Sequence, residues 1–136
     1  MKKQLSICAV ALFFNCFQMS AQETSGAGSQ PKEKPKVLYG KASFYANKFE
    51  GRRTANGEIF SQKKLTAACN VLPLGSWIRV TNLRNRRSVV VKINDHLHYR
   101  MKRLVDLSRA AALRIGHRDG LIRVKVELLA VKNAGE

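Results

Sequence analysis

The segment VKINDHLHYR, residues 91–100, places a carboxylate directly before two imidazoles. Apolar and polar residues alternate over residues 91–94, which predicts a β-strand that ends at Asp95 and continues as a loop. His96 and His98 follow in that loop. Such a group can perform general acid–base catalysis, can contribute metal ligands, or can be a solvated polar loop. The elements around the segment must distinguish these three possibilities.

Two further carboxylates stand in short motifs, Glu58 in TANGE and Asp106 in VDLS. Acids are scarce, because the chain has 9 Asp and Glu against 25 Lys and Arg, with a formal net charge of +16 at pH 7. Carboxylates can divide the work of acid and base when their environments separate their pKa values. The alternative for each is a surface or helix-capping role.

The first 21 residues have the pattern of a secretory signal peptide, with cleavage expected after Ala21. Two lysines precede an apolar run over residues 5–14, which is shorter than the roughly 20 residues that span a bilayer. We therefore expect export to the periplasm or cell envelope without stable membrane insertion. Cys16 could carry a lipid, but Asn15 stands where a lipid-attachment site usually has a small residue, which disfavours an anchor.

Residues 22–36 are rich in Gly, Ser, Pro and Lys, and they predict a flexible leader. One folded domain is expected over residues 37–131, followed by a short tail at 132–136. Cleavage of the signal peptide leaves Cys69 as the only cysteine, so no internal disulfide can form. Export also argues against nucleic acid as the partner of the basic surface, and favours cell-wall polymers or simple solvation.

The remaining pattern predicts short strands and one helix. Strands are expected at residues 37–46, 76–82, 87–94 and 121–130. The helix is expected at residues 106–117, with Ser108 as its N-cap and Gly116 at its end. Gly40 indicates a bulge or a close backbone approach in the first strand. Short strands with one helix predict a β-barrel or β-sandwich.

Four segments occur in a familiar order: GKASFYANKFEGRRTANGEIF, LTAACNVLPLGSWIRVTNLRNRRSVVVKIND, RLVDLSRAAALRIG and the last strand. Together they resemble the rare lipoprotein A family of septal peptidoglycan lytic transglycosylases, over residues 38–129. The resemblance implies a mainly β fold, a six-stranded double-psi β-barrel with one or two short helices. It also implies endolytic cleavage of MurNAc–GlcNAc β-1,4 bonds to 1,6-anhydromuramyl ends, without a cofactor or metal. The implied partners are peptidoglycan glycan strands and possible cell-wall or division machinery.

The resemblance also assigns roles to residues. Asp95, in the IND motif, is expected to be the general acid and base, and Glu58 is expected to assist it. Asp106 is expected to accept backbone N–H groups near the start of the helix. Residue type, rather than the resemblance, makes Tyr45 the better aromatic for the groove, with Trp77 as a further candidate, and core packing is the alternative for each. The expected substrate contacts are Tyr45, Thr54, Asn56, Cys69, Asn94 and His96.

Two departures from the family pattern keep alternatives open. LTAAC stands where the family has LTAAH, and INDHLH stands where it has INDRGP. Cysteine is a weak hydrogen-bond donor and carries no positive charge, so the chain could be a catalytically silent glycan-binding barrel. His96 or His98 could instead restore the missing donor. A metal-binding barrel is the third reading, because Cys69, Asp95 and the histidines include zinc-ligand types.

Overall fold

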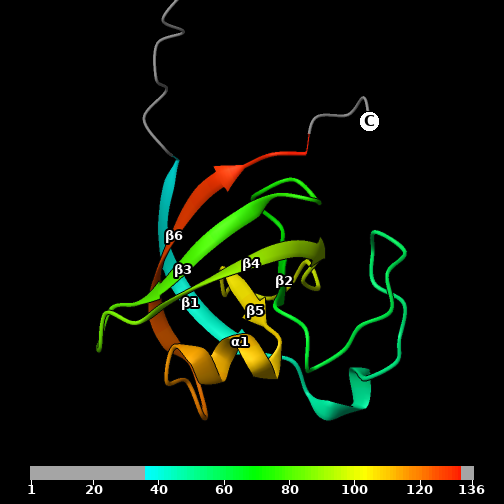
Figure 1. Ribbon diagram of the computed structural model, residues 1–136, viewed down its shortest axis with the longest axis horizontal. Coiled ribbons are helices and arrows are strands. Elements are labelled where there is room, and N and C mark those ends of the chain that lie inside the picture. The colour runs from blue at the N-terminus through cyan, green and yellow to red at the C-terminus, as the bar shows by residue number, and fades with distance from the viewer. Residues whose placement is uncertain (1–35, 133–136) are drawn as a thin grey trace, which may run out of the picture. The chain divides into compact units, whose positions relative to one another are not determined.

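The computed structural model describes residues 36–132 (Figure 1). The predicted signal peptide, nearly all of the leader and residues 133–136 lie outside the described residues. The elements are β1 Val37–Phe44, the 3-10 turn η1 Asn47–Phe49, β2 Thr66–Cys69, β3 Trp77–Asn82, β4 Ser88–Asp95, β5 Val105–Leu107, α1 Arg109–Arg114 and β6 Ile122–Ala130. No helix within this range is both long and apolar enough to cross a membrane.

The six strands form a closed barrel in the order β1-β5-β2-β4-β3-β6 (Figure 1). The pairs β1/β5 and β2/β4 are parallel, and the other neighbouring pairs are antiparallel. The first and last strands pair with each other, from Val37 opposite Glu127 to Ala42 opposite Ile122, which closes the barrel. The predicted six-stranded, mainly β barrel is therefore confirmed.

Alternating residues of the long strands fill the barrel. Fully buried side chains from β3, β4 and β6 are Ile78, Val80, Val91, Ile93, Val124 and Val126. Because each such side chain contributes about 1.5–3 kcal/mol when removed from water, this interior is the main source of stability. α1 adds to the same core through Ala111 and Ala112.

Two strands escaped prediction because they lack the alternating pattern. All residues of β2 and β5 are buried, so neither TAAC nor VDL shows a polar face. The expected role of Asp106 was wrong for the same reason: it lies in β5, and its carboxylate accepts from the Arg103 guanidinium, with Nη2–Oδ2 at 2.9 Å, rather than from backbone N–H groups.

The helix is shorter than predicted, since residues 106 and 107 belong to β5. Its expected signals are nevertheless confirmed. The Ser108 hydroxyl accepts the Ala111 N–H at 3.3 Å, and Gly116 follows the helix with φ of 72°. The close approach expected at Gly40 is also present, because a Cβ at this position would lie 2.7 Å from Leu104 Cβ.

His117, which follows the helix, is buried with neither ring nitrogen hydrogen-bonded to another described residue. Its ring packs edge-on against Phe44, with ring centroids 5.1 Å apart. Burial lowers the pKa of His117, an effect that nearby Asp119 opposes and Arg109 reinforces. The imidazole is therefore held in its neutral form.

This burial predicts an acid-sensitive fold. As pH falls through about 6.5, the unfolded chain protonates this histidine more readily than the folded chain, whose pKa is lower, so the free energy of unfolding should fall as pH drops below 7. We expect His117→Leu to flatten that fall, measured by urea denaturation at several pH values. Equal slopes for the parent and the variant would contradict this assignment.

Candidate active site

A β-bulge of one residue in β4 directs the Asp95 side chain away from the core. β2 and β4 pair regularly up to Ala67 opposite Ile93, but Ala68 then pairs with Asp95, which leaves Asn94 as the extra residue. Strict alternation would continue the buried positions Val91 and Ile93 into Asp95. A β-bulge interrupts that alternation and redirects side chains. Asp95 is consequently half-buried at the strand end rather than fully buried in the barrel.

Three donors hold the Asp95 carboxylate in one orientation. The Tyr45 hydroxyl donates to Oδ2 at 2.7 Å. The backbone N–H groups of Ala55 and His96 donate to Oδ1 at 3.0 Å and 2.9 Å. These donors come from the end of β1, from the loop before β2 and from Asp95's own loop. Asp95 is thus the point at which three segments distant in sequence meet.

Tyr45 is a support for Asp95 and is too buried to be a stacking surface for a sugar. It is 8% exposed, with its ring centroid 4.2 Å from that of Phe60 and 5.6 Å from that of Phe49. Burial, together with the hydrogen bond to Asp95 and its negative charge, raises the pKa of Tyr45 far above its usual value. The hydroxyl therefore keeps its proton near neutral pH. The expected groove-lining role does not fit this packing.

Removing that hydroxyl should disturb the orientation of Asp95 while leaving the aromatic cluster intact. We expect Tyr45→Phe to lose about 1 kcal/mol of unfolding free energy, the usual contribution of one hydrogen bond. The glycan cleavage that the family resemblance implies should fall more than glycan binding, because positioning affects kcat more than KM. The exposed Tyr39, 66% accessible, provides the matched control Tyr39→Phe. Equal cleavage by both variants would refute the positioning role.

Glu58 binds Asn94, the residue before Asp95 in β4, and is held as an anion. Its Oε1 accepts from Lys92 Nζ at 2.7 Å and from Asn56 Nδ2 at 2.9 Å, and its Oε2 accepts from Asn94 Nδ2 at 3.1 Å. The hydrogen bonds from Lys92 and then Asn94 lower the pKa of Glu58 to about 2. Glu58 cannot supply a proton near neutral pH, but it can place a fixed negative charge in the site.

The turn expected at Asn56-Gly57 builds this arrangement. Gly57 has φ of 90°, and its N–H donates to the Thr54 carbonyl at 3.0 Å. The Asn56 N–H donates to the Asn94 carbonyl at 3.2 Å, which fastens the turn to β4. Thr54 is 6% exposed, and its hydroxyl donates to Asn56 Oδ1 at 2.6 Å. Thr54 and Asn94 consequently support the turn and Glu58 from buried positions.

Cys69 does not present its side chain to a ligand. The whole residue, including the thiol, is fully buried in the main core cluster. The expected substrate contact through sulfur therefore does not fit the structure. Its carbonyl oxygen instead lies 3.4 Å from Nδ1 of His96, whose side chain is exposed. The following residue, Asn70, clamps the loop by binding the N–H and the carbonyl of Leu97, at 2.8 Å and 2.9 Å.

The candidate metal site receives no support from the geometry. Among residues 36–132, no three His, Cys, Asp or Glu side chains lie close enough together to hold a metal ion.

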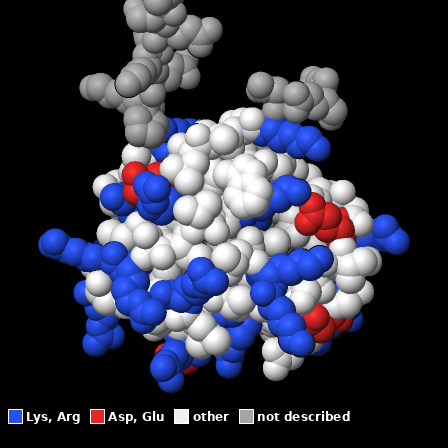
Figure 2. Space-filling view, viewed as in Figure 1, with Lys and Arg blue, Asp and Glu red and all other residues white. Residues whose placement is uncertain are grey.

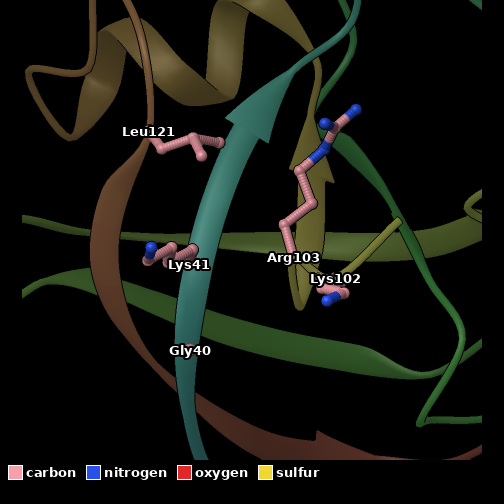
Figure 3. Close-up of a pocket in the computed structure, with 5 residues that line it drawn as sticks. All are labelled: Gly40, Lys41, Lys102, Arg103 and Leu121. Carbon is pink, nitrogen blue, oxygen red and sulfur yellow. The ribbon is translucent and has the colours of Figure 1, made fainter. Parts of the chain in front are cut away.

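A depression of about 340 Å³ lies elsewhere on the barrel, lined by Gly40, Lys41, Lys102, Arg103 and Leu121. Figure 3 shows its three cationic side chains pointing in different directions rather than toward one point. Arg103 is already bound to Asp106. The depression therefore lacks both the carboxylates and the convergence that the Asp95 site has.

Lys92 is the functional residue that sequence reasoning missed. Its outward position in the alternating pattern of β4, three residues before Asp95, is a signal that could have identified it.

Together these features define a class: a double-psi β-barrel with an oriented aspartate at the end of β4 and an ionised glutamate, from the loop before β2, bound to that strand. The same barrel occurs in Streptomyces papain inhibitor (TM-score 0.58, 19% identity, covering 70% of this chain and 96% of that one). It also occurs in apo expansin of Clavibacter michiganensis (TM-score 0.58, 16% identity, covering 73% and 53%). At these identities the likeness concerns the fold alone.

The family described as "Lytic transglycolase" matches residues 38–126, and the chain belongs to this family. The chain is 50% identical over 97 residues to the "Endolytic peptidoglycan transglycosylase RlpA" of Pasteurella multocida, covering 71% of this chain and 33% of that protein. It is 44% identical over 113 residues to the protein of the same name from Haemophilus influenzae, covering 82% and 39%. The chain thus spans about a third of the length of these relatives.

Proposed function

We propose that this protein is an endolytic peptidoglycan lytic transglycosylase that acts in the cell envelope. Family membership supports the reaction class. The observation that carries the proposal is the Asp95 carboxylate oriented by three donors, with the Glu58 anion bound to Lys92 and to Asn94, the residue before Asp95. Residues 1–21 would direct export, and glycan strands would be the substrate. Contact with cell-wall or division machinery is a further part of this proposal.

The proposed reaction consumes no water. Protonated Asp95 donates its proton to the glycosidic oxygen, and the bond from muramyl C1 to that oxygen breaks, which releases the GlcNAc hydroxyl. The muramyl 6-hydroxyl oxygen then bonds to C1 and gives its proton to the Asp95 carboxylate, which regenerates the acid. The Glu58 anion stabilises the positive charge that develops on the sugar ring.

His96 is the residue best placed to compensate for the histidine that the family has at position 69. Its backbone N–H binds Asp95, and its ring lies beside the Cys69 carbonyl. When Nδ1 carries the proton and donates to that carbonyl, Nε2 is left as a hydrogen-bond acceptor. His96 would therefore offer the substrate a polar ring atom from a different point on the backbone.

A glycan-binding barrel without cleavage is the second candidate function. The burial of Cys69 favours it, because a buried thiol, which is only a weak hydrogen-bond donor, stands where the family has a histidine. Both candidates predict binding to glycan strands, and they differ only in product formation.

Digestion of purified glycan strands, with and without stem peptides, tests the proposal. Mass spectrometry should find 1,6-anhydromuramyl ends, each one water lighter than a hydrolysed reducing end. Hydrolysed ends would contradict a transglycosylase, and binding without any new ends would support the second candidate. Trace contamination is controlled by a parallel preparation of Asp95→Asn, which should form no new ends if the products come from this protein.

A further inference from the structure

An exposed tryptophan stands beside the acid pair on the outside of the barrel. Trp77 is 46% exposed, although the neighbouring inward positions Ile78 and Val80 are fully buried. It lies directly opposite Lys92 in the antiparallel β3/β4 pair. Directly opposed residues in such a pair project from the same face of the sheet. Since Lys92 binds Glu58 at 2.7 Å, the indole stands next to the lysine that fixes the assisting acid.

The strand on the other side of β3 leaves this indole uncovered. Trp77 pairs with Ala130 of β6, and the register shifts between Trp77 and Ile78. A methyl group covers little of an indole ring. Exposed indole faces are favourable surfaces for stacking, because they are large, flat and apolar with little conformational entropy to lose.

Arg79 adds a cation on the same face. It is exposed and lies two residues after Trp77, so the two Cα atoms are about 7 Å apart along the strand. Its neighbours across the sheet are Val90 and Glu127, and Glu127 is engaged by Lys125 at 3.1 Å. Within residues 36–132, Arg79 takes part in no salt bridge. Its guanidinium is therefore available to a carboxylate, which it can bind in bidentate fashion.

An indole and a guanidinium at this spacing match one sugar of the proposed substrate. Muramic acid has a pyranose ring that can stack on the indole, and a lactyl carboxylate that is free wherever the stem peptide is absent. We propose that Trp77 and Arg79 form a binding subsite for a muramyl residue of a peptide-free glycan strand. The subsite rests on the proposed function, and it would hold the strand across β3 while Asp95 and Glu58 act at the cleaved bond. Figure 2 shows Lys and Arg over much of the visible face with few acids, a surface suited to a strand that carries carboxylates.

Two probes distinguish the contribution of Trp77 to binding from that of Arg79. Binding is measured in the Asp95→Asn protein, so that no probe is cleaved. One probe is a peptide-free muramyl glycan strand, and the other is a neutral N-acetylglucosamine hexamer, which lacks the lactyl carboxylate. Trp77→Ala should weaken binding of both probes about tenfold, because each presents sugar rings. Arg79→Gln should weaken the muramyl strand about tenfold and leave the neutral hexamer unchanged.

Matched controls are available on the same barrel. Tyr39→Ala removes another exposed aromatic residue, and Arg123→Gln removes another exposed arginine, on β1 and β6. Neither control should change binding of either probe, and thermal melting should show that all four variants fold. Equal loss with Arg79→Gln and Arg123→Gln would overturn the carboxylate contact. Unchanged binding by Trp77→Ala would overturn the subsite.

Different experimental results would contradict the subsite and the proposed function. If the wild-type protein forms anhydro ends while Trp77→Ala and Arg79→Gln bind normally, only the subsite is overturned. If the parent protein neither binds nor cleaves the strands, the proposed function fails, and the subsite fails with it.

Discussion

Asp95→Asn is expected to lower cleavage of glycan strands by about a thousandfold or more, while binding stays within a few-fold of the parent. General acid–base catalysis by one side chain contributes about 10²–10⁴-fold, and here one carboxyl group would perform both proton transfers. An amide can neither give nor take the proton. The rate of appearance of 1,6-anhydromuramyl ends, with binding to the same strands, measures the two effects separately.

The substitution should leave the fold intact, for a reason visible in the site. Both backbone donors, from Ala55 and His96, point at Oδ1, which an asparagine amide oxygen can replace. The amide nitrogen would then face the Tyr45 hydroxyl, which can accept as well as donate. Unchanged thermal melting is therefore expected. Full cleavage by Asp95→Asn would remove Asp95 from the mechanism.

Glu58→Gln is expected to lower cleavage about a hundredfold, the usual scale for removing one electrostatic contribution to a transition state. Glutamine keeps the size of the side chain and an oxygen for the Asn94 amide, but its NH2 group would face the donors Lys92 and Asn56, so the loss should reflect both the charge and these hydrogen bonds. Lys92 would lose its anionic partner. Comparing Glu58→Gln, Lys92→Met and the double variant would show whether the lysine acts through Glu58, in which case their effects are not additive.

The pH dependence gives a second test of the role of Glu58. Because the pKa of Glu58 is lowered to about 2, the folded protein keeps this group ionised above about pH 4. Its contribution to folding is present above the unfolded pKa of about 4.5 and is lost as pH falls toward 2. Glu58 therefore contributes no limb of its own to the pH profile of cleavage between about pH 4 and 8, and Glu58→Gln should keep the number of limbs in that range. Loss of a limb in Glu58→Gln would show that Glu58 itself donates or accepts the catalytic proton.

The sequence was sufficient for the architecture wherever a periodic pattern existed. β3, β4 and β6 alternate, and the Ser108 and Gly116 signals bracket α1. β2 and β5 could not be predicted, because every residue of these short strands is buried and their sequences therefore show no alternation of apolar and polar residues.

The site was only partly predictable for a related reason. Short motifs identified Asp95 and Glu58, but the partners that orient them come from other segments. Tyr45 reaches Asp95 across 50 residues of sequence, and Lys92 reaches Glu58 across 34. The burial of Cys69 likewise follows from barrel closure, since β2 is enclosed between β4 and β5. No local pattern contains such information.

The pairing of β1 with β6 also determines whether the chain can be circularly permuted or fused to another domain. The Leu128 N–H donates to the Lys36 carbonyl at 2.9 Å, so the chain enters and leaves the barrel at neighbouring points. A circular permutant that links Val131 to Lys36 and opens the turn between β3 and β4 would preserve all six strand pairs. A second domain could likewise be fused before β1, after β6 or at both ends without separating any two paired strands.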